Sequence, residues 1–116
     1  MHWADHTAQR LSEKYGSQVI ASGITPSGEF HIGHLREILT AEMIHRACLD
    51  AGENSAYIFI VDSMDPLSRV YDFLSDDYEK YIGCPLAYIP SPNPEGTPNY
   101  EGESYAMHFL NPFLDA

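Results

Sequence analysis

The fold is decided by residues 19–61, which read VIASGITPSGEFHIGHLREILTAEMIHRACLDAGENSAYIFIV. The apolar run at residues 19–21 predicts a short buried strand, and the two glycines and the proline of residues 22–30 predict a loop. From Ile32 onward apolar residues recur every three or four positions, which predicts a helix up to the next glycine. Residues 56–61 are aromatic and β-branched, so they predict a central parallel strand covered on both faces.

The order strand, loop, helix, strand is a βαβ unit, the smallest piece of a doubly wound parallel sheet. We therefore predict an α/β fold with a parallel sheet and flanking helices. Ligands of such sheets bind beyond the carboxyl ends of the strands. The segments at those ends are SGITPSGEFHIGH (residues 22–34) and DSMDPLS (residues 62–68), where we expect the chemistry to lie.

Outside this unit the pattern is weaker. It predicts an amphipathic helix at residues 5–15, a short helix at 75–81, a short extended piece at 84–89 and a closing helix at 105–114. Residues 90–102 contain four prolines and predict an exposed irregular loop.

Length and charge exclude several classes of protein. A chain of 116 residues is too short for a two-domain enzyme, and it has no apolar run long enough to cross a bilayer and no signal peptide, so we expect a cytoplasmic protein without a membrane partner. Six Lys and Arg against 17 Asp and Glu give a net charge of −11, which argues against sequence-independent binding of nucleic acid. Cys48 and Cys84 show no paired spacing, which favours free buried thiols over a disulfide or a metal cluster.

The histidines of His31-Ile32-Gly33-His34 lie where the loop becomes the helix, three residues apart and therefore on one face of its first turn. A helix N-terminus favours phosphate, and two imidazoles there add donors for the same anion. Gly33 removes a side chain where a base or ribose could approach the backbone. The alternatives are a capping His31 with a surface His34, or a zinc site, for which two histidines without a third ligand are a poor set.

Residues 22–37, SGITPSGEFHIGHLRE, resemble the signature of class I lysyl-tRNA synthetases, and HIGH is the hallmark of class I aminoacyl-tRNA synthetases in general. The opening HWAD, the segment DSMDP and the later SYAMHF are also similar to the lysine family, so the resemblance covers essentially the whole chain. It implies the first half of a Rossmann-like, HUP-type catalytic domain. The implied reaction is ATP-dependent activation of L-lysine to lysyl-adenylate and transfer to tRNA(Lys), releasing AMP and diphosphate.

The resemblance also implies roles for particular residues. The two histidines, His31 and His34, would contact the ATP phosphates and steady the transition state. Residues expected to shape the ATP site are Thr25, Pro26, Ser27 and Gly28, together with Gly33. Candidates for contacting bound lysine are Gly23 and Thr25.

Two carboxylates after the second strand, Asp62 and Asp65, could meet the substrate's ammonium groups or ribose hydroxyls. An equally favoured interpretation is that Asp65 caps the turn before Pro66 and Asp62 anchors the loop. For Arg36 and Glu37, a solvated face or a local ion pair is favoured over a substrate role.

The chain departs from the family pattern in three ways. The second class I signature, the KMSKS loop that grips the ATP phosphates, is absent, so we expect an N-terminal fragment of a longer synthetase that is inactive alone. An Arg-Lys pair common after DSMDP is replaced by residues 67–69, LSR. Some relatives bind zinc through Asp, Cys and His just before SYA-H-F, where only His108 of such a set remains, so we predict no metal site in this segment.

The expected ligands are therefore ATP, brought with Mg²⁺, and L-lysine, whereas tRNA(Lys) would bind mainly through regions outside this chain. Three alternatives stay open: a glutamyl-type synthetase, a nucleotidylyltransferase of the same superfamily, and a non-catalytic nucleotide-binding or interaction module. The flanking sequence speaks against the first two. No arginine lies between Gly16 and His31 to receive a second carboxylate, and no aromatic-Asp-Pro segment precedes HIGH.

Overall fold

A computed structural model describes residues 2–115 of the chain, which form two compact units. The first unit contains the residues up to Ile24 and His31–Ile60. The second contains Thr25–Phe30 and the residues from Val61 onward. Among the described residues, no helix is both long enough and apolar enough to cross a membrane.

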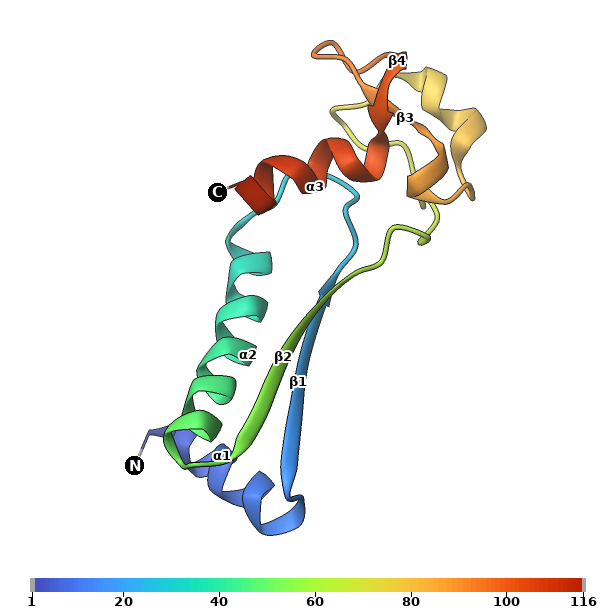
Figure 1. The fold of residues 1–116 in the computed structure, drawn as a ribbon. Coiled ribbons are helices and arrows are strands. Elements are labelled where there is room, and N and C mark those ends of the chain that lie inside the picture. The colour runs from blue at the N-terminus through green and yellow to red at the C-terminus, as the bar shows by residue number, and fades with distance from the viewer. Residues whose placement is uncertain (1, 116) are drawn as a thin grey trace. The chain divides into compact units, whose positions relative to one another are not determined.

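The first unit contains the predicted βαβ arrangement. Its elements in chain order are α1 (Trp3–Lys14), β1 (Ser17–Ile24), α2 (Ile32–Asp50) and β2 (Asn54–Val61). The strands β1 and β2 pair in a two-stranded sheet and run in the same direction, as α2 returns the chain between them (Figure 1). The prediction of an α/β fold with a parallel sheet is confirmed at this level, and so are the two predicted helices.

Helix α1 packs against α2, and a small cluster of buried residues lies between them. Its members are small side chains, Ala4, Ala8, Ala47 and Cys48. Both cysteines are free thiols; Cys48 is fully buried, as predicted, whereas Cys84, in the second unit, is only partly buried.

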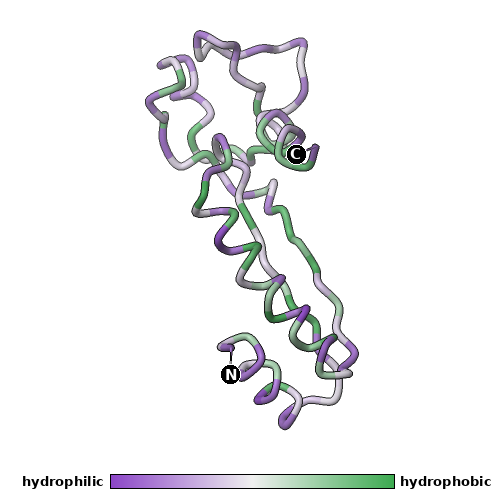
Figure 2. Tube along the Cα trace, turned by 90° about the vertical axis from the view of Figure 1, so that its left-hand side faces the viewer, coloured by the Kyte–Doolittle hydropathy of each residue, from purple (hydrophilic) through white to green (hydrophobic). Residues whose placement is uncertain are grey.

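Coverage of the sheet differs from the prediction. Figure 2 shows hydrophobic stretches in the strands beside mixed hydrophobic and hydrophilic turns of α2. Along β2 exposure alternates, and Ile58 and Ile60 are 48% and 52% exposed. Within this unit α2 packs against β1 and α1 packs against α2, so one face of the sheet is left without a helix. The prediction that β2 is covered on both faces is therefore wrong for the described residues.

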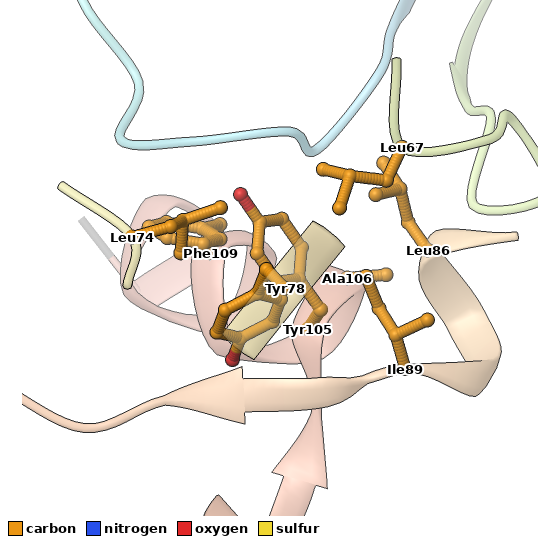
Figure 3. Close-up of a cluster of buried hydrophobic side chains, with 8 residues drawn as sticks. All are labelled: Leu67, Leu74, Tyr78, Leu86, Ile89, Tyr105, Ala106 and Phe109. Carbon is orange, nitrogen blue, oxygen red and sulfur yellow. The ribbon is translucent and has the colours of Figure 1, made fainter. Parts of the chain in front are cut away.

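The second unit is built from short elements. These are the 3₁₀ helices η1 (Asp76–Tyr81) and η2 (Leu86–Tyr88), the antiparallel strands β3 (Pro90–Pro92) and β4 (Pro98–Ser104), and helix α3 (Tyr105–Asp115). Its hydrophobic core is shown in Figure 3 and consists of Leu67, Leu74, Tyr78, Leu86, Ile89, Tyr105, Ala106 and Phe109. The predicted helices at 75–81 and 105–114 are confirmed, the first as a 3₁₀ helix.

Two predictions for this unit are wrong. Residues 84–89 are not extended, because Pro85 begins the 3₁₀ turn η2, in which the Tyr88 N–H donates to the Pro85 carbonyl at 3.0 Å and Leu86 is buried. Residues 90–102 are not an irregular loop throughout, because β3 and β4 pair at its two ends. The turn between them is closed by Asn93 and by Gly96, whose φ of 92° suits glycine.

Candidate functional site

Helix α2 begins with the two predicted histidines, which cap it reciprocally. Nδ1 of His31, the N-cap residue, accepts a hydrogen bond from the Gly33 N–H at 3.0 Å. Nδ1 of His34 accepts from the His31 N–H at 3.1 Å, and the two ring centroids lie 4.1 Å apart. A neutral imidazole whose Nδ1 accepts carries its proton on Nε2. Both rings therefore have an N–H donor on the side away from the cap.

The electrostatics of this cap favour a neutral imidazole at His34. Burial and the neighbouring His31 ring lower the pKa of His34 below its ordinary value, and Glu37 opposes this more weakly. His34 is accordingly neutral at pH 7. The capping interpretation and the functional one do not exclude each other here, because Nδ1 caps the helix while Nε2–H can donate to a ligand.

The absence of a side chain at Gly33 is required by packing, which could not be predicted from the sequence. A Cβ at this position would lie 2.7 Å from Cε1 and 2.9 Å from Nδ1 of the His31 ring. Any larger residue would therefore displace the imidazole from the cap. Glycine at this position keeps the histidine in place, whether or not a nucleotide also approaches the backbone.

The end of β1 is joined to the first turns of α2 by Glu37, for which the sequence favoured a solvated face or a local ion pair over a substrate role. The Gly23 N–H donates to Oε1 of Glu37 at 3.2 Å. A Cβ on Gly23 would lie 3.2 Å from the Ile60 carbonyl oxygen, so the strand backbones approach closely here. The only sequence signal for Glu37 was its position three residues after His34, on the same helix face.

A hollow of about 380 Å³ lies between β1 and α2 within the first unit. Gly33, Arg36 and Glu37 line one side of it, and Ser22 lines the other. Arg36 and Glu37 thus lie at a concave surface, and both residues are exposed, as the predicted solvated face requires.

In the second unit, the loop that follows β1 is held by a side-chain contact across the sequence. The Thr25 hydroxyl donates to Oδ2 of Asp65 at 2.5 Å, which joins this loop to the segment after β2. The interpretation of Asp65 as a cap for its own turn is not what the structure shows. Asp62 is exposed and makes no hydrogen bond with any described residue, so it does not join this contact.

The rest of the same loop is anchored by buried groups. Pro26 is fully buried, and the Ser27 carbonyl accepts a hydrogen bond from the hydroxyl of Tyr105 at 2.5 Å. A Cβ on Gly28 would touch the ring of Phe73 at 3.4 Å. Sequence reasoning noted the SYAMHF segment that contains Tyr105 but assigned the tyrosine no role, because its partner lies 78 residues away.

Metal ligands do not gather in the described part of the chain. Between residues 2 and 115 no group of three or more His, Cys, Asp or Glu is arranged to hold a metal ion. Nδ1 of His108 lies 3.9 Å from Oε1 of Glu103, beyond hydrogen-bond distance. The absence of zinc stays a prediction.

The two units thus present different chemistry. The first offers imidazole N–H donors at the positive end of a helix, where an anion such as phosphate is stabilised. The second offers a firmly anchored loop with a threonine hydroxyl and a carboxylate joined to each other. Donors of this kind stabilise charge by fixed orientation and require no nucleophilic side chain.

Comparison with known proteins identifies the family of this chain. The family model described as tRNA synthetases class I (K) matches residues 1–116. The chain is 49% identical over 116 residues to a lysine–tRNA ligase of Archaeoglobus fulgidus, 48% over 120 residues to one of Methanocaldococcus jannaschii and 44% over 116 residues to one of Methanosarcina barkeri. Each alignment covers 100% of this chain and 22%, 21% and 20% of the relative. The chain therefore spans about a fifth of the length of these relatives, and it belongs to the family of class I (K) tRNA synthetases.

Proposed function

We propose that this chain is the N-terminal part of the catalytic domain of a cytoplasmic lysine–tRNA ligase. In that enzyme residues 1–116 would supply the first half of a Rossmann-like, HUP-type sheet. The exposed apolar face of β2 supports this proposal, because a strand of a larger sheet would present such a face to further layers. The name shared by the three relatives supports the lysine specificity.

The reaction proposed for the whole enzyme has two steps. A carboxylate oxygen of lysine attacks the α-phosphorus of ATP, a new P–O bond forms, and the bond to diphosphate breaks to leave lysyl-adenylate. A ribose hydroxyl at the 3′ end of tRNA(Lys) then takes the lysyl group and releases AMP. Neither step needs a protein nucleophile, so the enzyme's task is orientation and stabilisation of phosphate charge.

The reciprocal histidine cap is the observation that carries the proposal. Its Nδ1 atoms hold the helix backbone, so His31 and His34 would direct Nε2–H donors to the ATP phosphates at the positive end of α2. Gly33 would let ATP approach the same turn. Mg²⁺ would arrive bound to the ATP phosphates.

The remaining candidate residues would bind the rest of ATP and the amino acid. Residues 25–28 would shape the ATP site, and their hydrogen bonds to Asp65 and Tyr105 would fix the loop before substrate arrives. Gly23 and Thr25 would contact lysine, and Asp62 and Asp65 would attract its ammonium groups or a ribose hydroxyl. Glu37, which already holds the Gly23 N–H, would position that strand end.

The charge of this segment bears on the tRNA. A net charge of −11 opposes binding of a phosphate backbone, so tRNA(Lys) would be held mainly by other parts of the enzyme. The segment's own role would be ATP and lysine activation.

Lysine-dependent exchange of pyrophosphate into ATP tests the proposal on the full-length protein that contains this segment. We expect exchange with lysine, a loss of about 10²-fold or more in kcat/KM for His34→Ala, and little change for His6→Ala, an exposed histidine in α1. Exchange with glutamate but not lysine would favour a glutamyl-type enzyme, and no exchange with any amino acid would favour a nucleotidylyltransferase or a binding module. Exchange by the 116-residue chain alone would contradict its expected inactivity.

A further inference from the structure

A second concave surface lies in the second unit, among residues that the proposed activation does not use. It is a pocket of about 530 Å³ between the loop that precedes α2, the end of β4 and helix α3. Pockets of about 300 to 1,000 Å³ are typical of small-molecule sites. The side chains on which its chemistry depends are Glu29, Phe30, Glu103, His108, Phe109 and Phe113.

Aromatic rings form the apolar wall of this pocket. The rings of Phe30 and Phe113 lie with centroids 4.3 Å apart and planes 30° apart. Phe109 meets the ring of His108 edge to face, at 4.9 Å and 90°. The faces of phenyl rings carry negative charge density, so a wall of this kind attracts a cation as well as an apolar stem.

The polar groups of the pocket are acidic. Two carboxylates, Glu29 and Glu103, line it, and among the described residues no Lys or Arg does so. Oε2 of Glu103 accepts a hydrogen bond from Asn111 at 2.9 Å, which orients the carboxylate. Oε1 lies 3.9 Å from Nδ1 of His108, beyond hydrogen-bond distance, so this oxygen has capacity to accept from a ligand.

We propose that this pocket binds a primary ammonium group carried on an apolar stem, the chemical form of a lysine side chain. The carboxylates would accept the ammonium hydrogens and the phenyl rings would pack on the stem. An anion is disfavoured by the two like charges. A metal ion is disfavoured because residues 2–115 contain no suitable group of three ligands.

Titration of the ¹⁵N-labelled 116-residue chain with n-pentylammonium, followed by NMR, tests the proposal. We expect saturable shifts at the backbone amides of Phe30, Glu103 and His108, with smaller changes elsewhere. n-Pentanol has the same stem without the charge, and ammonium ion has the charge without the stem. Equal shifts at these amides with either of these two probes would overturn the proposal.

Single substitutions locate the site. Glu103→Gln and Glu29→Gln should each weaken n-pentylammonium binding about tenfold, since each loses a charge-assisted hydrogen bond. Glu29 makes no hydrogen bond or ion pair with a described residue, so its variant leaves the packing intact. Glu101→Gln is the matched control, because Glu101 is exposed on the same strand as Glu103 but lies outside the pocket. Unchanged affinity in both pocket variants, or equal weakening in the control, would overturn the proposal.

Two further probes distinguish the source of the ammonium group. L-Lysine represents the free amino acid, and Nα-acetyl-L-lysine methylamide represents a lysine side chain of a peptide. Chemical-shift changes on addition of L-lysine would indicate that the pocket takes the free amino acid. Changes with the amide alone would indicate that it takes a lysine side chain of a peptide. The absence of shifts with both would overturn the proposal.

Discussion

Tyr105→Phe tests whether one buried hydroxyl holds the loop proposed to shape the ATP site. The ring of Tyr105 is fully buried, and its hydroxyl donates to the Ser27 carbonyl at 2.5 Å. Burial raises the pKa of this hydroxyl far above its ordinary value, so it stays protonated and able to donate at all physiological pH values. The substitution removes this single hydrogen bond and leaves the ring contacts with Tyr78 and Phe109 in place.

The size of the effect follows from what the substitution leaves behind. The Ser27 carbonyl loses its partner, and because this hydrogen bond is partly buried, its loss costs about 0.5 to 1.5 kcal/mol, the typical net contribution of one hydrogen bond. For a chain of this length that loss corresponds to a fall in Tm of roughly 2 to 8 °C. The looser loop should also raise KM for ATP in the full-length protein more than it lowers kcat, because orientation of the bound nucleotide is lost before the histidine donors are affected.

Urea unfolding of the 116-residue chain and pyrophosphate exchange by the full-length protein measure the two effects. Tyr88→Phe is the matched control, because Tyr88 is 75% exposed and its hydroxyl makes no hydrogen bond with a described residue. If Tyr105→Phe proves as stable as Tyr88→Phe, the hydrogen bond to Ser27 does not anchor the loop. If stability falls and KM for ATP is unchanged, the loop is structural and has no part in nucleotide binding.

Three further predictions concern other contacts. Gly96→Ala should destabilise the chain by clearly more than Gly83→Ala in urea unfolding. Both glycines have positive φ, but only a Cβ at residue 96 would meet a backbone atom, at 2.5 Å. Equal losses of stability would mean that the conformational penalty of about 1 to 2 kcal/mol is the whole effect. Because the pKa of His34 is lowered, its contribution to stability is complete above about pH 6.5 and is lost as pH falls through the folded-state pKa. His34→Gln should therefore reduce the fall in unfolding free energy on the acid side of a plot against pH. The same fall in the variant would refute this. Burial raises the pKa of Tyr78 to about 12, so its contribution to stability is complete below about pH 10 and is lost as pH rises towards 12. Tyr78→Phe should therefore reduce the fall in unfolding free energy on the alkaline side. An identical fall in the variant would show that the pKa of Tyr78 is not raised.

The first unit could be predicted because its signals are local. The three-to-four residue period of α2 and the β-branched run of β2 each describe one element, and the loop between them carries its own glycines and proline. The prediction that β2 is covered on both faces was wrong for the described residues, because burial of a strand depends on what packs against it and no local pattern specifies a partner. The same applies to β3 and β4, whose pairing overrides the turn chemistry of four prolines.

The candidate site divides in the same way. His31 and His34 could be found from their spacing alone, since neighbours on one helix turn are fixed by helix geometry. Their reciprocal cap, and the packing of Gly33 against the imidazole, depend on side-chain rotamers that spacing does not specify. Glu37 lies on an exposed helix face as predicted, but its hydrogen bond from the Gly23 N–H could not be predicted because that partner belongs to another element.

The charge of the chain and the state of its histidines fit one account of phosphate binding. A segment with a net charge of −11 would repel ATP at long range, and His34 does not offset this with a full positive charge, because its pKa is lowered. What the cap provides is short-range and directional: N–H donors at the positive end of α2, held by their own Nδ1 bonds to the backbone. Under the proposed function, attraction of ATP would therefore fall to cations elsewhere in the enzyme, and this segment would orient the phosphates once they arrive. A site of this kind separates capture from alignment, and the lysine carboxylate could then attack a phosphate already fixed in place.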